Sequence, residues 1–247
     1  GNSDFWGFVW QGNAYEGLTC NALEWQASEG GGHIIKPDGR ITVNNPAAAR
    51  AFERAAGWVG SISPPEVTSY QEEEARELWE RGNAGFMRNW PYVYWLGNNS
   101  QIAGKFEITV LPAGAGGQHA ATLGGWQLMV SRYSENIEAA SLLVRHLTSY
   151  ESQKARAIDQ GYLPTIATLY SDGDVLRAQP YVSNLLAVFN NSVARPSTVV
   201  DDNYDEVSVA YFDAVHSIIT GKRGAADALS RLEQDLVNIT GFPTGSP

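Results

Sequence analysis

The amino-acid sequence predicts an α/β protein in which helices pack in layers around a sheet. Segments with the apolar pattern of strands recur between longer segments whose apolar residues have helical spacing. Clusters of glycine or proline, such as those at 30–32 and 64–65, separate these segments. With 247 residues, the chain is long enough for one large domain or for two lobes.

The first sixty or so residues predict two helices and a hairpin. Apolar residues at near-helical spacing favour a helix over 14–28 that ends before three glycines. The turn sequence at 37–40, between two short β-branched runs, indicates a small hairpin. Asn45 is expected to cap the next helix, because Pro46 then occupies the first helical position, where its missing N–H is tolerated.

A third helix and a strand are expected next. The helix covers 71–81, with Ser69 as its predicted cap and three glutamates in its first turn, where the helix dipole favours negative charge. We interpret this glutamate run as a solvated turn and not as a metal site. A short strand over 84–88 leads into Pro91, at which a new helix begins.

The rest of the chain predicts two strands and a series of helices. The strands cover 106–111 and 126–131, and the glycine-rich segment 112–117 follows the first of them. This segment lacks the Lys-Ser/Thr ending of a phosphate-binding loop, so we interpret it as a mobile connection. Helices are expected near 135–149, 151–160, 174–188, 203–220 and 224–239.

The charge and the cysteine content exclude several classes of protein. The formal charge is -10, from 27 acidic and 17 basic residues, and no segment concentrates lysine or arginine, so we expect no nucleic-acid partner. No window approaches the roughly 18 consecutive apolar residues of a membrane helix. The single cysteine, Cys20, excludes an internal disulfide and a multi-cysteine metal site.

No motif for a metal, a cofactor or a catalytic nucleophile is present. The four histidines are dispersed, there is no Gly-x-Ser-x-Gly elbow, and Cys20 is predicted to be buried and inert. Two acid pairs, Glu16 with Glu24 and Asp201 with Asp202, keep a glycoside-processing enzyme as the alternative, since that reaction uses two carboxylates across a sugar. We otherwise expect no catalysis and no cofactor.

The eight tryptophans and eleven tyrosines are the unusual feature of the composition. Trp58 and Trp79 fall within predicted helices and are expected in the core. Trp90 and Trp126 instead lie where loops meet predicted elements, and binding groups tend to collect at such positions.

These two tryptophans, together with Tyr92 and Arg195, predict a sugar site. A pyranose has an apolar C–H face and a rim of hydroxyls, so it suits an aromatic platform beside fixed polar groups. The five donors of an arginine fork across neighbouring hydroxyls. Gly125, next to Trp126, lets a ligand approach the backbone closely because glycine has no Cβ.

Several motifs resemble the bacterial and archaeal trehalose/maltose-binding proteins, and they stand in the order found in that family. Together they extend from about residue 5 to 240, so the resemblance covers effectively the whole chain. The motifs are Gln11–Asn21, Phe86–Tyr92, Val110–Pro112, Leu123–Leu128 and Ala194–Pro196.

The resemblance implies a periplasmic-binding-protein-like two-lobe fold, in which a sugar binds in the cleft between two α/β lobes that close about a hinge. Tyr15 and Glu16 are weaker candidates for contact with the sugar. The positions that line the sugar pocket in this family correspond here to Trp90, Tyr92, Gly125, Trp126 and Arg195.

The resemblance also implies an assignment of segments to the lobes. Residues 1–112 and 168–243 are expected to form a nearly complete second, C-terminal lobe. Residues 121–165 would be the returning segment of a partial first lobe, with hinge crossings at 113–120 and 166–167.

The amino-terminal segment that builds most of the first lobe is expected to be missing from this sequence. Side chains that would face it should then be exposed and promote self-association, or association with a chain supplied in trans. They are Leu128, Val130, Leu142, Leu143 and Leu147.

As a function, the resemblance implies binding of an α-linked disaccharide such as trehalose or maltose. The sugar would pass to the membrane permease subunits of an ABC importer, and the protein would be extracytoplasmic, either periplasmic or lipid-anchored at the cell surface. The residues do not choose among trehalose, maltose, sucrose and longer glucosides. An interaction module without a sugar ligand stays open as a third class, for which added sugar would leave the tryptophan fluorescence unchanged.

Overall fold

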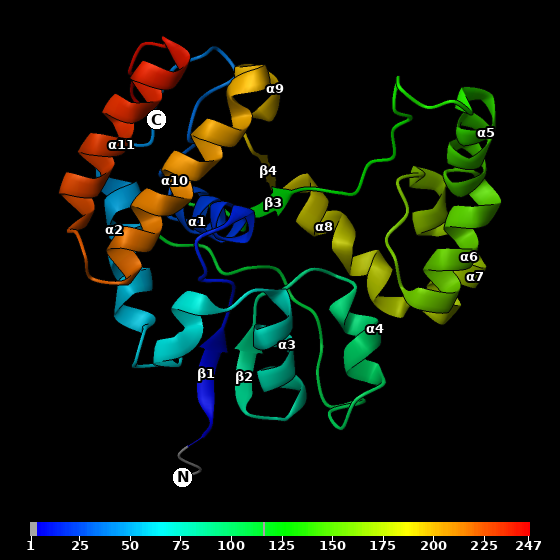
Figure 1. Cartoon of the computed structure of the whole chain (residues 1–247). Coiled ribbons are helices and arrows are strands. Elements are labelled where there is room, and N and C mark those ends of the chain that lie inside the picture. The colour runs from blue at the N-terminus through cyan, green and yellow to red at the C-terminus, as the bar shows by residue number, and fades with distance from the viewer. Residues whose placement is uncertain (1–3, 116) are drawn as a thin grey trace. The chain divides into compact units, whose positions relative to one another are not determined.

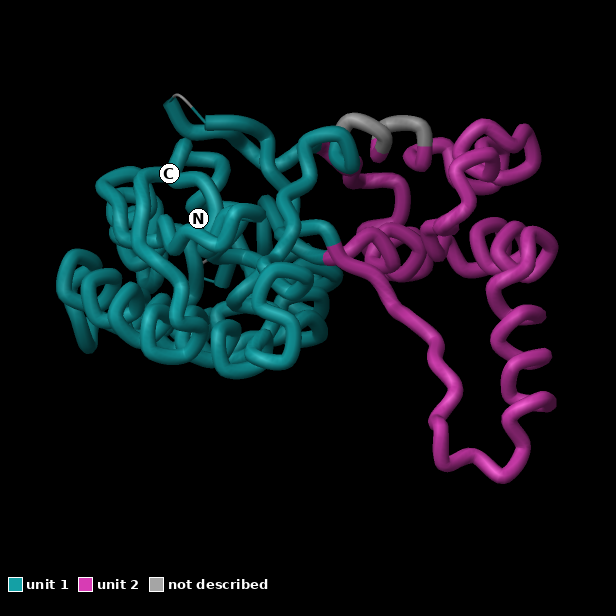
Figure 2. The backbone as a smooth tube through the Cα atoms, turned by 90° about the horizontal axis from the view of Figure 1, so that it is seen from above, with its two compact units in different colours: residues 1–89, 110–123, 188–247 teal, residues 90–109, 124–187 magenta. Residues whose placement is uncertain are grey.

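The computed structural model describes residues 4–115 and 117–247 and divides into two compact units (Figure 1, Figure 2). Unit 1 comprises residues 1–89, 110–123 and 188–247, and unit 2 comprises residues 90–109 and 124–187. The chain therefore passes between the units four times. Gly116, part of the predicted glycine-rich connection, lies outside the described residues.

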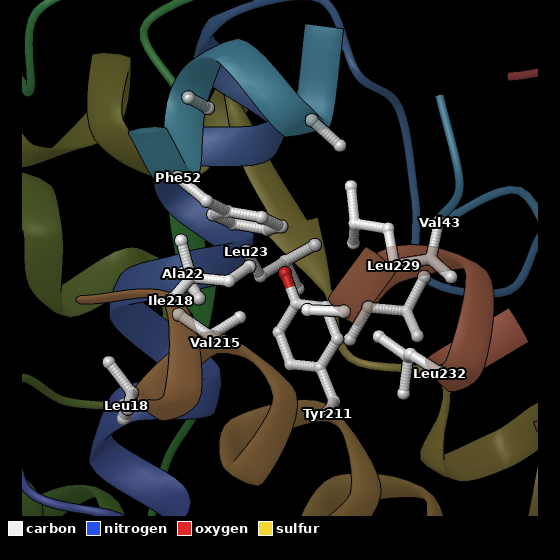
Figure 3. Close-up of a cluster of buried hydrophobic side chains, with 14 of the residues drawn as sticks. Leu18, Ala22, Leu23, Val43, Phe52, Tyr211, Val215, Ile218, Leu229 and Leu232 are labelled. Carbon is white, nitrogen blue, oxygen red and sulfur yellow. The ribbon is translucent and has the colours of Figure 1, made fainter. Parts of the chain in front are cut away.

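Four helices enclose the main core of unit 1. Leu18, Leu23, Phe52 and Tyr211 belong to one cluster of buried side chains among them (Figure 3). Eleven of the 13 residues of α1 are buried, so this helix is enclosed on nearly all sides and its polar side chains need internal partners. The four helices are α1 (Glu16–Ser28), α2 (Pro46–Trp58), α10 (Tyr204–Ile219) and α11 (Ala225–Thr240).

Unit 1 also holds two pairs of parallel strands. One pair is β1 (Trp6–Val9) with β2 (Ala84–Met87), and the other is β3 (Ala121–Leu123) with β4 (Ser192–Ala194). Because the strands of each pair are parallel, their carboxyl ends lie at the same edge. Helix α1 contacts both β3 and β4.

Shorter elements complete unit 1. Helix α3 (Glu72–Glu80) packs against β1 and β2 and contributes Ala75 to a small cluster with Val9 and Ala84. The other short elements are η1 (Pro65–Ser69), α9 (Ser197–Val200) and η4 (Asp201–Asn203).

Unit 2 is built from helices around a small core of Ala157, Leu169 and Val175. Gly161 ends α6 with φ +69°, a left-handed conformation that favours glycine, and its carbonyl oxygen accepts a hydrogen bond from the Tyr181 hydroxyl at 2.9 Å. Helix α8 (Leu185–Asn190) begins in unit 2 and ends in unit 1. The other elements are α4 (Val93–Asn98), α5 (Ile137–Leu147), α6 (Tyr150–Gln160), η2 (Ala167–Ser171), α7 (Gly173–Ala178) and η3 (Pro180–Asn184).

Most of the predicted helices are confirmed, with ends shifted by one or two residues. The Asn45 cap is confirmed, because its side-chain oxygen accepts hydrogen bonds from the amides of Ala47 and Ala48 at 3.0 Å. Trp58 and Trp79 pack against the core clusters as expected, although each stays partly exposed.

Two predicted strands were wrong. Residues 106–111 and 126–131 have no regular secondary structure, and residues 123–129 are exposed. A strand needs a hydrogen-bonding neighbour, and the described part of the chain pairs none with either segment. The predicted hairpin is reduced to one antiparallel bridge between Ile35 and Ile41.

Two details of the predicted helices were also wrong. Helix 174–188 is divided into α7, η3 and α8, because Pro180 has no N–H to continue the helical ladder. Ser69 belongs to η1, where its hydroxyl donates to the Glu66 carbonyl oxygen at 2.8 Å. The residue that precedes α3 is Gln71, whose backbone amide donates to the carboxylate of Glu74 at 2.9 Å.

The assignment of segments to lobes stays a prediction. In the structure, residues 121–123 belong to unit 1, whereas residues 124–165 belong to unit 2 together with 90–109 and 166–187.

Candidate functional site

Each predicted site residue follows the carboxyl end of a parallel strand. Trp90 and Tyr92 come after β2, Gly125 and Trp126 come after β3, and Arg195 directly follows β4. In α/β proteins, ligands bind beyond the carboxyl ends of parallel strands, where the loops carry the functional side chains. The five residues therefore occupy the places in the chain at which such a site is expected.

An ion pair holds Arg195 at the carboxyl end of β4. Its guanidinium donates to the carboxylate of Glu16 in the first turn of α1, and its Nη2 also donates to the carbonyl oxygen of Leu123 at 3.5 Å. The side chains of Arg195 and Glu16 are 24% and 41% exposed. Both groups are thus held by protein contacts while part of each remains open to solvent.

Two hydroxyls from α10 complete the shell of donors around the Glu16 carboxylate. Tyr204 donates to Oε1 and Ser208 donates to Oε2. Since Ser208 has one hydroxyl proton, Thr19 is the donor in the 2.9 Å hydrogen bond between the two hydroxyls. Burial and the Glu16 carboxylate raise the pKa of Tyr204, which keeps this group a neutral donor. We call Glu16, Thr19, Arg195, Tyr204 and Ser208 the Glu16 cluster.

Tyr15, the other weak candidate, lies at the start of α1. A Cβ on Gly17 would come within 2.1 Å of the Tyr15 ring, so a side chain at position 17 would displace this ring from its place beside the first helical turn. Burial, followed by Glu72, raises the pKa of Tyr15, so its hydroxyl also stays neutral.

Unit 2 carries the four other predicted residues. Trp90 and Tyr92 are partly buried at the start of α4, where the amide of Val93 donates to the Trp90 carbonyl oxygen at 3.1 Å. Trp126 is 100% exposed, and the space in which Gly125 would carry a Cβ is open. The indole of Trp126 therefore presents its full surface to solvent.

The sequence placed Arg195 and Glu16 among the candidates, and the structure joins them. The sequence did not indicate Tyr204, Ser208 and Thr19, which enter the cluster through tertiary packing of α10 on α1. The one available signal was a tyrosine in the first turn of the helix that follows Arg195. Convergence of Trp90, Tyr92, Gly125, Trp126 and Arg195 on one ligand stays a prediction.

One of the two acid pairs considered for glycoside processing is not available as a catalytic pair. Glu24 is 3% exposed and is bonded by Arg88 and by the amide of Thr122, so it is not available to a substrate. Asp201 and Asp202 are exposed on the short helix η4. Retaining and inverting mechanisms both need two carboxyl groups that face one glycosidic bond, and the buried Glu24 cannot supply one of them.

Metal-binding and membrane-spanning features were sought over the described residues. Residues 4–115 and 117–247 contain no group of three or more His, Cys, Asp or Glu side chains placed to hold a metal ion. In the same part of the chain, no helix has the length and apolar content needed to cross a bilayer.

Comparison with known proteins places these features in a family context. The family model for bacterial extracellular solute-binding proteins matches residues 2–154. A probable ABC transporter-binding protein of Deinococcus radiodurans is 53% identical over 242 residues, which cover 97% of this chain and 58% of that protein.

Solved structures show the same fold. The maltose-bound MalE3 protein of T. maritima has a TM-score of 0.89 and 39% identity, with 95% of this chain and 61% of that chain covered. A solute-binding protein of an ABC transporter from Thermotoga lettingae, bound with α-D-tagatose, has a TM-score of 0.83 at 21% identity and covers 96% and 60% of the two chains. At that identity the likeness shows the fold alone.

The predicted α/β, periplasmic-binding-protein-like fold is confirmed by these structures, of which the chain covers a part. It spans 58% of the Deinococcus protein and 61% of the T. maritima protein.

Proposed function

Because the chain belongs to the family of bacterial extracellular solute-binding proteins, we propose that it supplies sugar-contacting residues of a transport receptor. The observation that carries this proposal is the 39% identity, at a TM-score of 0.89, with a protein solved with bound maltose. The family consists of binding proteins and not of enzymes, so the ligand is held and released unchanged.

The ligand we propose is an α-linked disaccharide such as maltose or trehalose. The exposed indole of Trp126 and the aromatic rings of Trp90 and Tyr92 offer apolar faces to the C–H groups of a pyranose. Arg195 and Glu16 offer a donor and an acceptor to sugar hydroxyls, and the Glu16 cluster fixes both in place before the ligand arrives. Gly125 adds open space beside the backbone.

The receptor would work outside the cytoplasm, in the periplasm or lipid-anchored at the cell surface, and pass the sugar to the permease subunits of an ABC importer. The family description and the Deinococcus relative support this part of the proposal. A soluble disaccharide and a membrane permease are therefore the two partners we propose.

Calorimetric titration of the 247-residue chain tests the proposed ligand class. We expect heat of binding with maltose, trehalose or sucrose and none with cellobiose, because a β-linkage turns the second ring away from positions suited to an α-linked sugar. Samples kept with maltose should release no glucose. Absence of binding to every α-linked sugar would contradict the proposed ligand, and glucose release would favour the glycoside-processing alternative.

We also propose that the chain self-associates through an apolar surface of unit 2. Leu128, Leu142 and Leu143 are 53%, 59% and 57% exposed, as expected, whereas Val130 and Leu147 are partly buried. Exposed apolar side chains in such number favour association, because contact removes them from water.

Sedimentation velocity at increasing concentration measures this association. The double variant Leu142→Glu with Leu143→Glu should shift the protein toward the monomer, since a carboxylate in an apolar contact is desolvated without a partner. The control is Ile62→Glu, which changes a side chain of unit 1 that is 45% exposed and should leave the distribution unaltered. A parent chain that stays monomeric at every concentration would refute the association.

A further inference from the structure

Four buried polar side chains lie where two segments of unit 1 lead toward the candidate sugar residues. They are Gln11, Asn21, Glu24 and Arg88, and they are linked by hydrogen bonds. Building on the proposed sugar-binding function, we propose that the Glu24–Arg88 ion pair positions the sugar-contacting residues by fixing both segments to α1. Neither residue touches the sugar in this role, so both are positioning residues.

The first segment is held through Arg88. Its Nε and Nη2 donate to the two oxygens of Glu24 at 2.8 and 2.6 Å, and the side chains are only 4% and 3% exposed. Such two-point contact fixes the orientation of a guanidinium as well as its distance. Trp90 lies two residues further along, so the pair fixes the chain just before it enters unit 2.

Gln11 fixes the backbone of the same segment. Its Nε2 donates to the carbonyl oxygen of Arg88 at 3.0 Å, and its Oε1 accepts from Arg88 Nη1 at 3.0 Å and from Asn21 Nδ2 at 3.1 Å. Both the main chain and the side chain of Arg88 are therefore held by residues that follow β1 or belong to α1.

The second segment is held by the same carboxylate. Oε1 of Glu24 also accepts from the amide of Thr122 at 3.0 Å, and the Thr122 hydroxyl donates to the carbonyl oxygen of Cys20 at 2.8 Å. Thr122 lies in β3, three residues before Gly125 and four before Trp126. One oxygen atom thus joins the segment that leads to Trp90 with the segment that leads to Trp126.

Stability alone is a weak reason for this arrangement. Desolvation of two charges opposes the attraction between them, and well-packed apolar residues often stabilise a core equally well. An ion pair differs from an apolar contact in its directionality, because only defined positions of the donors satisfy the carboxylate. To position the residues that follow two strands, the contacts at the strand ends must be directional.

Hydrogen–deuterium exchange of the 247-residue chain tests the proposal without any ligand. In Glu24→Gln, which keeps the shape but removes the charge, amides of 89–98 and 119–123 should exchange about tenfold faster, while α2, α10 and α11 keep their protection. Arg88→Lys should have the same effect, because a lysine keeps the charge but loses the two-point contact. The control is Glu80→Gln, which breaks the Arg76–Glu80 pair on α3 and should leave both segments unchanged.

Titration with maltose gives the second readout. Folded Glu24→Gln should bind at least tenfold more weakly than the parent chain, and Glu80→Gln should bind as the parent does. If exchange rises uniformly over unit 1, or if affinity is unchanged in the folded variant, the pair is only a stabilising contact and the proposal is wrong. If the parent chain binds no sugar, the proposed function fails, and the exchange pattern still decides whether the pair positions both segments. Should Glu24→Gln not fold, Arg88→Lys serves for both measurements.

Discussion

Replacement of Trp126 by alanine is expected to weaken binding of the sugar tenfold or more and to leave the stability of the chain almost unchanged. The indole is 100% exposed, so its removal takes no buried contact from the fold. A stacked aromatic ring contributes about 0.5–1.5 kcal/mol beyond its buried area, and about 1.4 kcal/mol corresponds to a tenfold change in affinity. Calorimetry and urea unfolding of the same samples measure the two effects.

Tyr133→Ala is the matched control, because Tyr133 is a large aromatic residue of unit 2 that is 79% exposed and lies outside the predicted site. It should change neither quantity. Trp90→Ala should weaken binding to a similar extent but also lower stability, since Trp90 is partly buried. Equal affinity in Trp126→Ala and in the parent chain would remove Trp126 from the site.

The sequence allowed the helices of unit 1 to be predicted because their signals are local. Asn45 and Pro46 mark the start of α2 by capping chemistry, and the glycines after residue 29 mark the end of α1. A local signal also placed Trp90 after the strand at 84–88, whereas Trp126 was placed at the start of a strand over 126–131 that does not form. Local patterns thus predicted the helix ends and the position of Trp90, but not that Trp126 follows β3.

The failures have a different physical origin. Residues 126–131 have the apolar composition of a strand, but strand formation depends on a neighbour elsewhere in the chain, which sequence spacing does not reveal. The same limit hid the contact between Glu16 and Tyr204, which are 188 positions apart. It also made Glu24 look like a possible catalytic acid, whereas Arg88 neutralises it in the interior.

Helix α1 shows how the core and the candidate site depend on each other. Its first turn holds Glu16, its middle holds the Glu24 carboxylate, and Leu18 and Leu23 enter the apolar core (Figure 3). Since these residues share one rigid helix, the apolar packing that fixes α1 also fixes the polar groups at its start. Loss of that packing should therefore lower the stability of the fold before it changes any single polar contact.

Tyr211→Ala is expected to destabilise unit 1 by about 3–5 kcal/mol, because it leaves a cavity in the main core. Tyr211 is fully buried, and its hydroxyl donates to Oε1 of Gln26 at 2.9 Å. The side-chain NH2 of Gln26 donates to the carbonyl oxygens of Gly31 and His33 at 3.0 and 2.8 Å. These bonds fix the side-chain amide, so its oxygen cannot rotate toward another donor.

Tyr211→Phe separates the two contributions, since it keeps the ring but leaves the Gln26 oxygen without its donor. It should cost about 1–3 kcal/mol, which is the usual effect of an unsatisfied buried polar atom. Val209→Ala on the same helix changes a side chain that is 46% exposed and should alter stability by about 0.5 kcal/mol or less. Urea unfolding monitored by circular dichroism ranks the three variants by their free energy of unfolding. If Tyr211→Ala is no less stable than Val209→Ala, then α10 is not packed on α1 through this residue, and the support for the Glu16 cluster is lost with it.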